Sequence, residues 1–368
     1  MPTNPSTLFL DVRDPRVVNR CDHKLSDILF ISLCTLLCNG EDFEDMVEFG
    51  TQRYDWLCHY LELPNGIPCA DTFNRVLQRL DPEELEACLR KDGQTLLDYL
   101  SEDQICFDGK KIKGVSPHSK GNQGFYILSA WSSQHTLCIG QSKVEDKSNE
   151  IQAIPTLIDQ LDLAGGLVSI DAIGCQKTIA SKLIRAQADY LLSLKHNQKS
   201  TFEDVVWLFG EVPCTSSQEE WEYDHGRYET RKCSIIKVSS TQKQALFDTW
   251  EGLTTLVKIE SSRLVQEKQK KETRYYLSSS PQQDAAYFNQ AVRGHWGIEN
   301  KLHWHLDVTF NEDACRARTG HAAENLNILR KMALHRVSKM DDKLSLKKRR
   351  YRASMNPDYL EQILNRKI

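Results

Sequence analysis

The 368-residue sequence lacks the features of membrane and secreted proteins. No apolar stretch reaches the roughly 18 residues that a membrane-spanning helix requires. The first residues, Met1 to Asn4, lack the basic segment followed by an apolar one that marks a secretory signal. We therefore expect a cytoplasmic protein with no membrane partner.

Cysteine is present without a pattern. None of the twelve cysteines forms a Cys-x2-Cys pair, and several, such as Cys34 and Cys38, lie within apolar runs. This distribution favours neither a zinc ribbon nor a disulfide framework. Buried free thiols are the simplest interpretation.

The sequence also lacks an excess of positive charge, since its net charge is −4. The segment from Arg330 to Ile368 is an exception, with twelve Lys or Arg against four Asp or Glu. Basic side chains favour phosphate contacts because they release condensed counterions. A solvated tail without a partner is the alternative. We expect residues 341–368 to form a basic C-terminal tail, with these candidate DNA contacts: Lys347, Arg349 and Arg350.

Hydrophobic content of 40% and charged content of 27% are typical of a globular protein, and the length predicts two or three domains. Residues 1–100 have a helical pattern and predict an all-helical N-terminal domain. Residues 101–340 are expected to form the main α/β domain, in which residues 211–280 are a β-rich insertion. The chain after Pro281 is predicted to be helical, apart from an extended stretch near Val308.

The start of the α/β domain has three strand candidates, at residues 104–110, 124–132 and 136–144, separated by turn residues. Helix and strand patterns then alternate from Pro155 to Lys195. This order resembles the ribonuclease H-like architecture, a mixed sheet with helices on both faces.

Three acidic residues stand out. Asp108 and Asp171 each follow an apolar run, so both are predicted at the C-terminal ends of strands, whereas Glu299 is expected on a helix. Carboxylate oxygens are suitable ligands for Mg²⁺. Each acid taken singly is more often an ordinary cap or surface charge.

The segment from Arg293 to Asp307 is dense in functional side chains. His295, Glu299 and His303 are spaced four residues apart and would line one face of a helix. A glutamate buried among aromatic residues would have a raised pKa unless a cation, such as a metal, compensated. An amphipathic helix packed on the core is the simpler alternative.

Five motifs carry a resemblance to a known family: Asp108-Gly109-Lys110, Lys147-Ser148-Asn149-Glu150-Ile151, Ile170-Asp171-Ala172-Ile173-Gly174-Cys175-Gln176, Asp189 to Gln198, and His295-Trp296-Gly297-Ile298-Glu299-Asn300. Together they resemble the H-repeat-associated family of bacterial insertion-sequence transposases. Its DDE-type catalytic domain is ribonuclease H-like. Residues 25–37 and 67–73 resemble the helical domain associated with it, so the likeness spans nearly the whole chain.

The resemblance implies that Asp108, Asp171 and Glu299 bind Mg²⁺, with Mn²⁺ able to substitute. Two metal ions could then stabilise the attacking and leaving oxygens of a DNA strand displacement. Related families carry a Tyr-Arg-Glu-Lys signature, whereas Val292, His295 and Leu306 take the other three places here. The role of those signature residues is therefore not transferable, although His295 could contact DNA.

The implied partners are double-stranded DNA, as terminal inverted repeats and target DNA, and a second copy of the chain in a homodimer on DNA. A nucleoid-associated, cytoplasmic location follows from such a substrate. Lys110 and Lys111, just past Asp108, could contact phosphates, although a solvated strand edge is an equal alternative. Lys195, at the end of another strand, could reach the same side of the sheet, with a plain turn as the alternative. The helical N-terminal domain is the candidate for recognising the element ends.

Two other functions stay open. His295, Glu299 and His303 could bind a catalytic transition metal, assisted by Asp307 or Asp313, because imidazole favours such metals. That hypothesis leaves Asp108 and Asp171 without a role. The chain could also be a catalytically inactive DNA-binding relic of a transposase.

Overall fold

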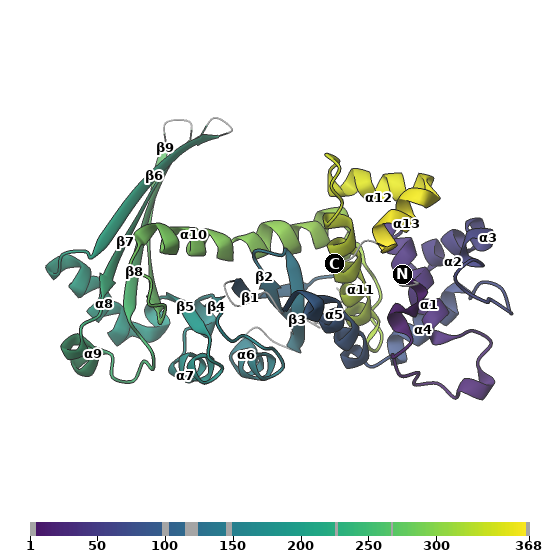
Figure 1. Cartoon of the computed structure of the whole chain (residues 1–368), viewed down its shortest axis with the longest axis horizontal. Helices are drawn as coiled ribbons and strands as arrows, with labels where there is room; N and C mark the ends of the chain where they lie inside the picture. Colours follow the sequence, from purple (N-terminus) through teal and green to yellow (C-terminus); the bar gives the residue numbers. More distant parts are fainter. Residues whose placement is uncertain are drawn as a thin grey trace.

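A nine-stranded mixed sheet runs through the centre of the molecule in the computed structural model (Figure 1). The structure describes residues 5–97, 103–114, 124–144, 149–224, 227–265 and 268–365. Lys147 and Ser148, part of one quoted motif, lie outside these ranges. Helices cover the sheet, and a helical assembly from both chain termini lies at one end of the molecule.

The strand order of the sheet is β3-β2-β1-β4-β5-β9-β8-β7-β6. The first three strands form an antiparallel meander, and β1, β4 and β5 run parallel. An antiparallel meander joined to parallel strands at β1 is the ribonuclease H-like arrangement, as the sequence predicts. The strands are β1 Gln104–Ile112, β2 Phe125–Ser132, β3 Leu137–Val144, β4 Leu167–Ile170, β5 Asp189–Leu194, β6 Ser216–Asp224, β7 Arg227–Lys237, β8 Thr255–Val265 and β9 Lys268–Ser278.

The helices follow the amphipathic segments of the sequence. At the start of the fifth helix, for example, the Asp81 side chain accepts a hydrogen bond from the Glu83 backbone N–H at 3.1 Å, and Pro82 occupies the first helical position. The α-helices are α1 Leu25–Leu37, α2 Phe43–Gln52, α3 Tyr54–Leu57, α4 Ala70–Arg79, α5 Pro82–Leu97, α6 Glu150–Asp159, α7 Lys177–Arg185, α8 Lys199–Glu211, α9 Ser240–Leu246, α10 Ala285–His295, α11 Ala322–Ser338, α12 Leu346–Met355 and α13 Pro357–Asn365.

The helix after α10 changes its hydrogen-bonding pattern. Beyond His295 the chain continues into two π-helical segments, η7 Glu299–His303 and η8 His305–Thr309. The extended stretch expected near Val308 is therefore wrong, because this residue lies inside η8. Such π-helical turns occur often at functional sites.

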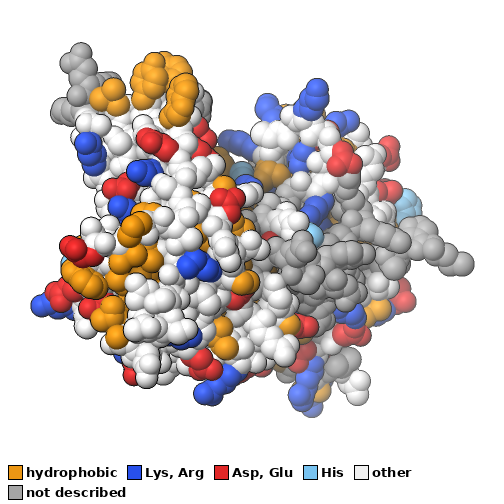
Figure 2. Space-filling model, turned by 60° about the vertical axis from the view of Figure 1, so that its left-hand side comes forward, with side chains coloured by type: hydrophobic (Ala, Val, Ile, Leu, Met, Phe, Trp, Pro, Cys, Tyr) orange, Lys and Arg blue, Asp and Glu red, His pale blue; other side chains and the backbone are white. Residues whose placement is uncertain are grey.

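The β-rich segment occupies the predicted part of the sequence, but it extends the main sheet. Strand β9 pairs antiparallel with β5, and β8, β7 and β6 follow in antiparallel order. The long hairpins form an arm that projects from the body of the molecule (Figure 1). Exposed hydrophobic side chains gather toward the end of this arm (Figure 2), among them Trp221, Tyr223, Tyr228 and Leu264.

The two ends of the chain share one hydrophobic core. Helix α1 packs against α11, and residues 341–365, expected as a tail, form α12 and α13 beside the N-terminal helices. The Arg53 guanidinium donates to the Ser354 carbonyl at 2.6 Å, and the Trp56 indole donates to Glu361 at 2.9 Å. None of the described helices is long and apolar enough to cross a membrane.

Candidate active site and metal centre

The pairing of β1 with β4 brings the two aspartates together. The parallel register runs from Gln104 opposite Leu167 to Phe107 opposite Ile170, so Asp108 and Asp171 are the next residues on each side. Asp171 follows the last residue of β4, as predicted. Asp108 instead lies in the middle of β1, which continues to Ile112 because β2 still pairs with it there. The expected strand end at Asp108 is therefore corrected.

Asp171 is also fixed by its own backbone. One oxygen of its carboxylate accepts a hydrogen bond from the Ile173 N–H at 3.1 Å, which caps the short 3₁₀ helix η5 Ala172–Gly174. The cap holds the side chain at the edge of the sheet, where the polypeptide leaves β4.

Two glycines let the helix that carries Glu299 lie close to the sheet. A side chain at Gly294 would place its Cβ 2.2 Å from the Gln104 amide oxygen, and one at Gly297 would lie 2.9 Å from the Trp131 ring. On the same segment, Ile298 and Leu302 are buried in the core. The helix is thereby anchored over β1 and β2.

His303 lies between Asp108 and Glu299 in space. Its Nδ1 atom is 3.6 Å from the Asp108 Oδ2 atom and 3.5 Å from the Glu299 Oε2 atom. One ligand atom from each of these three residues lies within 4.8 Å of the other two. The two distances from His303 are compatible with a shared metal ion, because ligands about 2 Å from one cation lie no more than roughly 4 Å apart.

The electrostatics of the cluster favour a cation. Burial, and then the neighbouring charges of Glu299 and Asp171, raise the pKa of Asp108 well above its usual value. The contact with His303 lowers the pKa of Glu299, while burial lowers the pKa of His303. Metal binding would relieve the repulsion among the acids.

A cavity of about 480 Å³ opens onto the three acids. Asp108, Asp171 and Glu299 all line it, together with Lys195 and His295. Lys195 is exposed at the end of β5, so its ammonium can reach an anion in this cavity. The fold thus gathers onto one cavity five of the residues singled out from the sequence.

His295 forms a hydrogen bond with a residue of strand β4. Its Nδ1 atom is 2.9 Å from the Ser169 hydroxyl, and burial lowers its pKa to about 4. The ring is therefore neutral at physiological pH and can only offer a hydrogen bond to a ligand. It does not supply the positive charge of the arginine for which it stands in the family signature.

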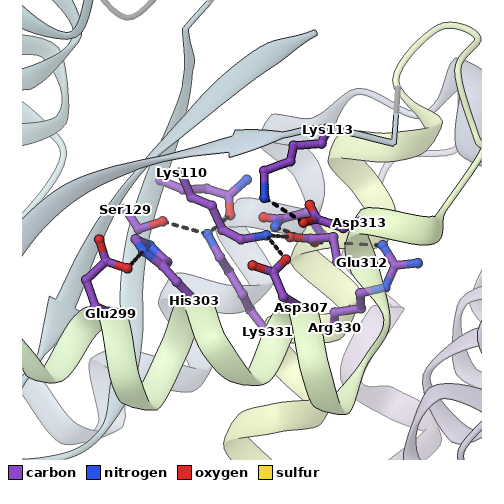
Figure 3. Close-up of polar contacts among 12 residues, drawn as sticks. Lys110, Lys113, Ser129, Glu299, His303, Asp307, Glu312, Asp313, Arg330 and Lys331 are labelled. Atoms are coloured by element: carbon purple, nitrogen blue, oxygen red, sulfur yellow. Dashed lines mark hydrogen bonds and ion pairs between the residues drawn. The ribbon is translucent and has the colours of Figure 1, made fainter. Parts of the chain in front are cut away.

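Three cations proposed as DNA contacts are instead internal, and the expectation for them is corrected. The Lys110 ammonium is buried between Asp307, at 2.6 Å, and Glu312, at 2.5 Å (Figure 3). Arg349 is buried and pairs with Asp342 at 2.8 Å, and it also donates to backbone carbonyls.

Arg350 is fully buried and donates to the carbonyl oxygens of Leu36, Thr309 and Gly40. Desolvation makes a buried cation favourable only when it is paired in this way, so these side chains stabilise the fold. Lys347 remains exposed on α12 and Lys111 remains partly exposed on β1. Both could contact DNA.

Other residues near the site carry no strong sequence signal. Glu150, at the start of α6, is buried beside Gly109, where an added Cβ would lie 2.1 Å from its carboxylate. Only its place in a family-like motif could have pointed to it. Arg274 on β9 lies 4.8 Å from the Trp296 ring and also lines the cavity, and nothing in the local sequence indicates this.

The ligand set of the transition-metal alternative, which is His295, Glu299 and His303, does not form in the described structure. The metal-compatible group found among the described residues pairs Glu299 and His303 with Asp108, without His295. Asp307 is paired with Lys110 and Asp313 with Lys113 at 2.8 Å, so neither acid points to the cluster as a spare ligand.

The fold and site define a ribonuclease H-like protein with an acidic site at the edge of its sheet. Two family models match the chain, the DDE_Tnp_1-associated model over residues 6–91 and the transposase DDE domain over residues 99–335. Since the second match covers more than half of the chain, the protein belongs to the DDE transposase family. This confirms the resemblance found in the sequence motifs.

Relatives match along most of the chain. "Putative transposase YncI" of Escherichia coli O157:H7 is 38% identical over 362 residues, covering 96% of this chain and 92% of the relative. "H repeat-associated putative transposase YhhI" of E. coli K12 is 36% identical, with 96% and 95% covered. A solved piggyBac transposase synaptic complex with hairpin DNA aligns over 98% of this chain and 76% of that chain, with 12% identity and a TM-score of 0.41.

Proposed function

We propose that the protein is an active DNA transposase that binds the ends of its own element and catalyses metal-dependent strand cleavage and strand transfer. The observation that carries the proposal is the convergence of Asp108, Asp171 and Glu299 on one cavity. They come from two strands and a helix that are far apart in the sequence. An ordinary surface acid would gain nothing from this placement, because the repulsion between like charges costs stability.

The donor set suits a divalent cation, and Mg²⁺ is the proposed one, with Mn²⁺ as a substitute. Asp108 and Glu299 would hold the cation, and Asp171, which lines the same cavity, would add a carboxylate oxygen. When bound, the cation supplies charge that stabilises the attacking and leaving oxygens of an in-line displacement. The buried Asp108 side chain gains most from the cation, because burial disfavours its ionised form.

The proposed reaction has two displacements at phosphorus. Water first forms a bond to the phosphorus as the bond to the 3′ oxygen breaks, which leaves a 3′-hydroxyl and a 5′-phosphate. That 3′-hydroxyl then attacks a phosphodiester of the target strand, and the new bond to phosphorus forms as the bond to the target's 3′ oxygen breaks, which leaves a 3′-hydroxyl on the target. Lys195 would hold a phosphate at the rim of the cavity, while the neutral His295 ring would orient the DNA by hydrogen bonding.

A second cavity supports a DNA path from the site along the arm. It has a volume of about 560 Å³ and shares Glu272, Arg274 and Trp296 with the cavity over the acids. Five cations and three acids line it, and the cations are Arg231, Arg263, Lys270, Arg274 and Arg293. The excess of positive charge favours a phosphate backbone. A homodimer is proposed because two element ends must be brought together.

The test uses the full-length protein and a duplex that carries the inverted repeat flanking its gene. Wild-type protein is expected to cut this end in Mg²⁺ and to join the released 3′ end to a target plasmid. Asp108→Asn, Asp171→Asn and Glu299→Gln should each lower the rate about a hundredfold or more, because each removes a metal-binding oxygen. The exposed Asp248→Asn is the control and should leave the rate unchanged.

DNA binding is measured in the same samples by a gel-shift assay. Binding without cleavage in every metal tested would favour the inactive DNA-binding relic. Cleavage that survives Asp108→Asn would contradict the assignment of the site.

A further inference from the structure

His303 has the most unusual environment of the side chains near the acids. Only 5% of the residue is exposed, although it carries a polar ring. Its Nδ1 atom faces both Asp108 and Glu299, and its buried Nε2 atom has no hydrogen-bond partner among the described residues. Burying a polar ring in this way is costly, and a cation bound at Nδ1 would offset part of that cost.

The local backbone makes this placement possible. His303 ends the π-helical segment η7, which begins at Glu299. The two side chains therefore lie on one face of the helix, and the buried neighbour Leu302 holds that turn against the core. Glu299 and His303 are thus supplied by the helical segment, whereas Asp108 is supplied by strand β1.

We propose that His303 is a nitrogen ligand of the catalytic cation, so that Asp108, Glu299 and His303 form a mixed oxygen and nitrogen site. The inference rests on the proposed metal site, and it adds a residue that the three-acid pattern does not contain. Asp171 lines the same cavity but is not one of the three residues whose ligand atoms lie within 4.8 Å of one another.

A nitrogen ligand changes the preference among metals. Imidazole binds transition metals better than it binds Mg²⁺, which prefers oxygen ligands. His303 should therefore contribute more to the affinity for Mn²⁺ than to the affinity for Mg²⁺. The site would hold Mn²⁺ more tightly than a site of three carboxylates, and Zn²⁺ would compete for it.

The test is electron paramagnetic resonance of Mn²⁺ bound to the full-length protein. Pulsed spectra of the wild type are expected to show hyperfine coupling to an imidazole nitrogen. Growing the cells with isotopically labelled histidine must change that coupling, and this arm needs no mutation that could disturb folding. His303→Gln should remove the coupling and weaken Mn²⁺ binding about tenfold or more, with a smaller loss for Mg²⁺ measured by competition.

Two other histidines serve as controls. His295→Gln removes an imidazole that lines the cavity over the acids, and His305→Gln removes one whose Nδ1 atom lies 2.9 Å from the Thr309 hydroxyl. Both variants should keep the nitrogen coupling. A coupling that disappears in His295→Gln but persists in His303→Gln would overturn the inference.

The outcomes separate this inference from the proposed function. Bound Mn²⁺ without nitrogen coupling, together with metal-dependent cleavage of the element end, overturns the role of His303 and leaves the transposase proposal standing. Nitrogen coupling lost in His303→Gln, together with no cleavage of any element end, supports the ligand and overturns the function. Failure of the wild type to bind Mn²⁺ overturns the ligand role.

Discussion

Lys110 and Glu312, which are 202 residues apart in the sequence, form a buried ion pair of 2.5 Å (Figure 3). Asp307 also contacts the Lys110 ammonium, and Asn327 donates to the other oxygen of Glu312 at 2.8 Å. Lys110 lies two residues after Asp108 on β1, whereas Asp307 follows Glu299 on the helical segment. The contact of Lys110 with Asp307 therefore ties the strand that carries Asp108 to the helical segment that carries Glu299.

Replacing this buried lysine should be costly. Lys110→Met leaves Asp307 and Glu312 without their shared cation, so we expect a loss of about 3 kcal/mol in the free energy of unfolding, measured by urea denaturation. Cleavage should fall as well, because the helix loses its tie to β1.

The matched control is Lys113→Met, which breaks the Lys113–Asp313 pair of 2.8 Å on the same segment. The Lys113 side chain is 66% exposed, so the loss should be no more than about 1 kcal/mol. Equal losses of stability from the two substitutions would contradict the role of Lys110 in holding the helix against β1.

The buried carboxyl group of Glu86 on α5 predicts a dependence of stability on pH. Burial is the main cause that raises its pKa from 4.5 to about 7, against the opposing charge of Arg90 at 3.5 Å. The unfolded chain ionises this group at lower pH than the folded chain. The contribution of this carboxyl group to the free energy of unfolding is therefore complete below pH 4.5. It is lost as the pH rises toward 7, by up to about 3 kcal/mol.

Glu86→Gln should remove this dependence. We expect the variant to gain stability relative to wild type at pH 8 and to gain little at pH 5, as followed by urea denaturation at both values. Glu83→Gln, at an exposed position of the same helix, is the control and should shift stability equally at both pH values. A difference between wild type and Glu86→Gln that is constant with pH would refute the prediction.

The close contact between Gly297 and Trp131 predicts a position that tolerates no side chain. Trp131 is almost fully buried, so its ring has little room to move away from a new Cβ at 2.9 Å. Gly297→Ala should cost about 1–3 kcal/mol of stability and shift the helix that carries Glu299. The cleavage rate should fall more than the affinity for DNA.

Gly210→Ala provides the comparison, because no atom lies within 4 Å of the added Cβ in helix α8. Alanine has the higher helix propensity, so this variant should be more stable by about 0.5–1 kcal/mol and should cleave normally. Normal cleavage by a folded Gly297→Ala protein would show that the helix position is not critical.

Much of the α/β domain could be predicted from the sequence. The alternation of apolar and polar residues depends on near neighbours, so it indicates the meander at β1 to β3 and the alternating units up to β5. The apolar runs before Asp108 and Asp171 mark their strands for the same reason. The motifs around both residues and Glu299 were specific enough to identify the transposase family.

Predictions from local sequence patterns were wrong where a side chain or strand contacts a partner that is distant in the sequence. Lys110 and Arg350 belong to the residue types that form DNA-binding surfaces. Both are nevertheless internal, because acids or carbonyl groups distant in the sequence surround them. The β-rich segment has the pattern of a separate insertion, but the pairing of β9 with β5 joins it to the main sheet. Nothing local to either strand specifies that pairing.

The sequence by itself determined the strands, the helices and the kinds of side chain available for chemistry, because these depend on residues within a few positions of one another. The tertiary structure decided which of those side chains meet. The register of β1 against β4 places the two aspartates side by side, and the approach permitted by Gly297 brings Glu299 and His303 to them. Contacts of this kind are set by packing over long separations, which no local pattern encodes.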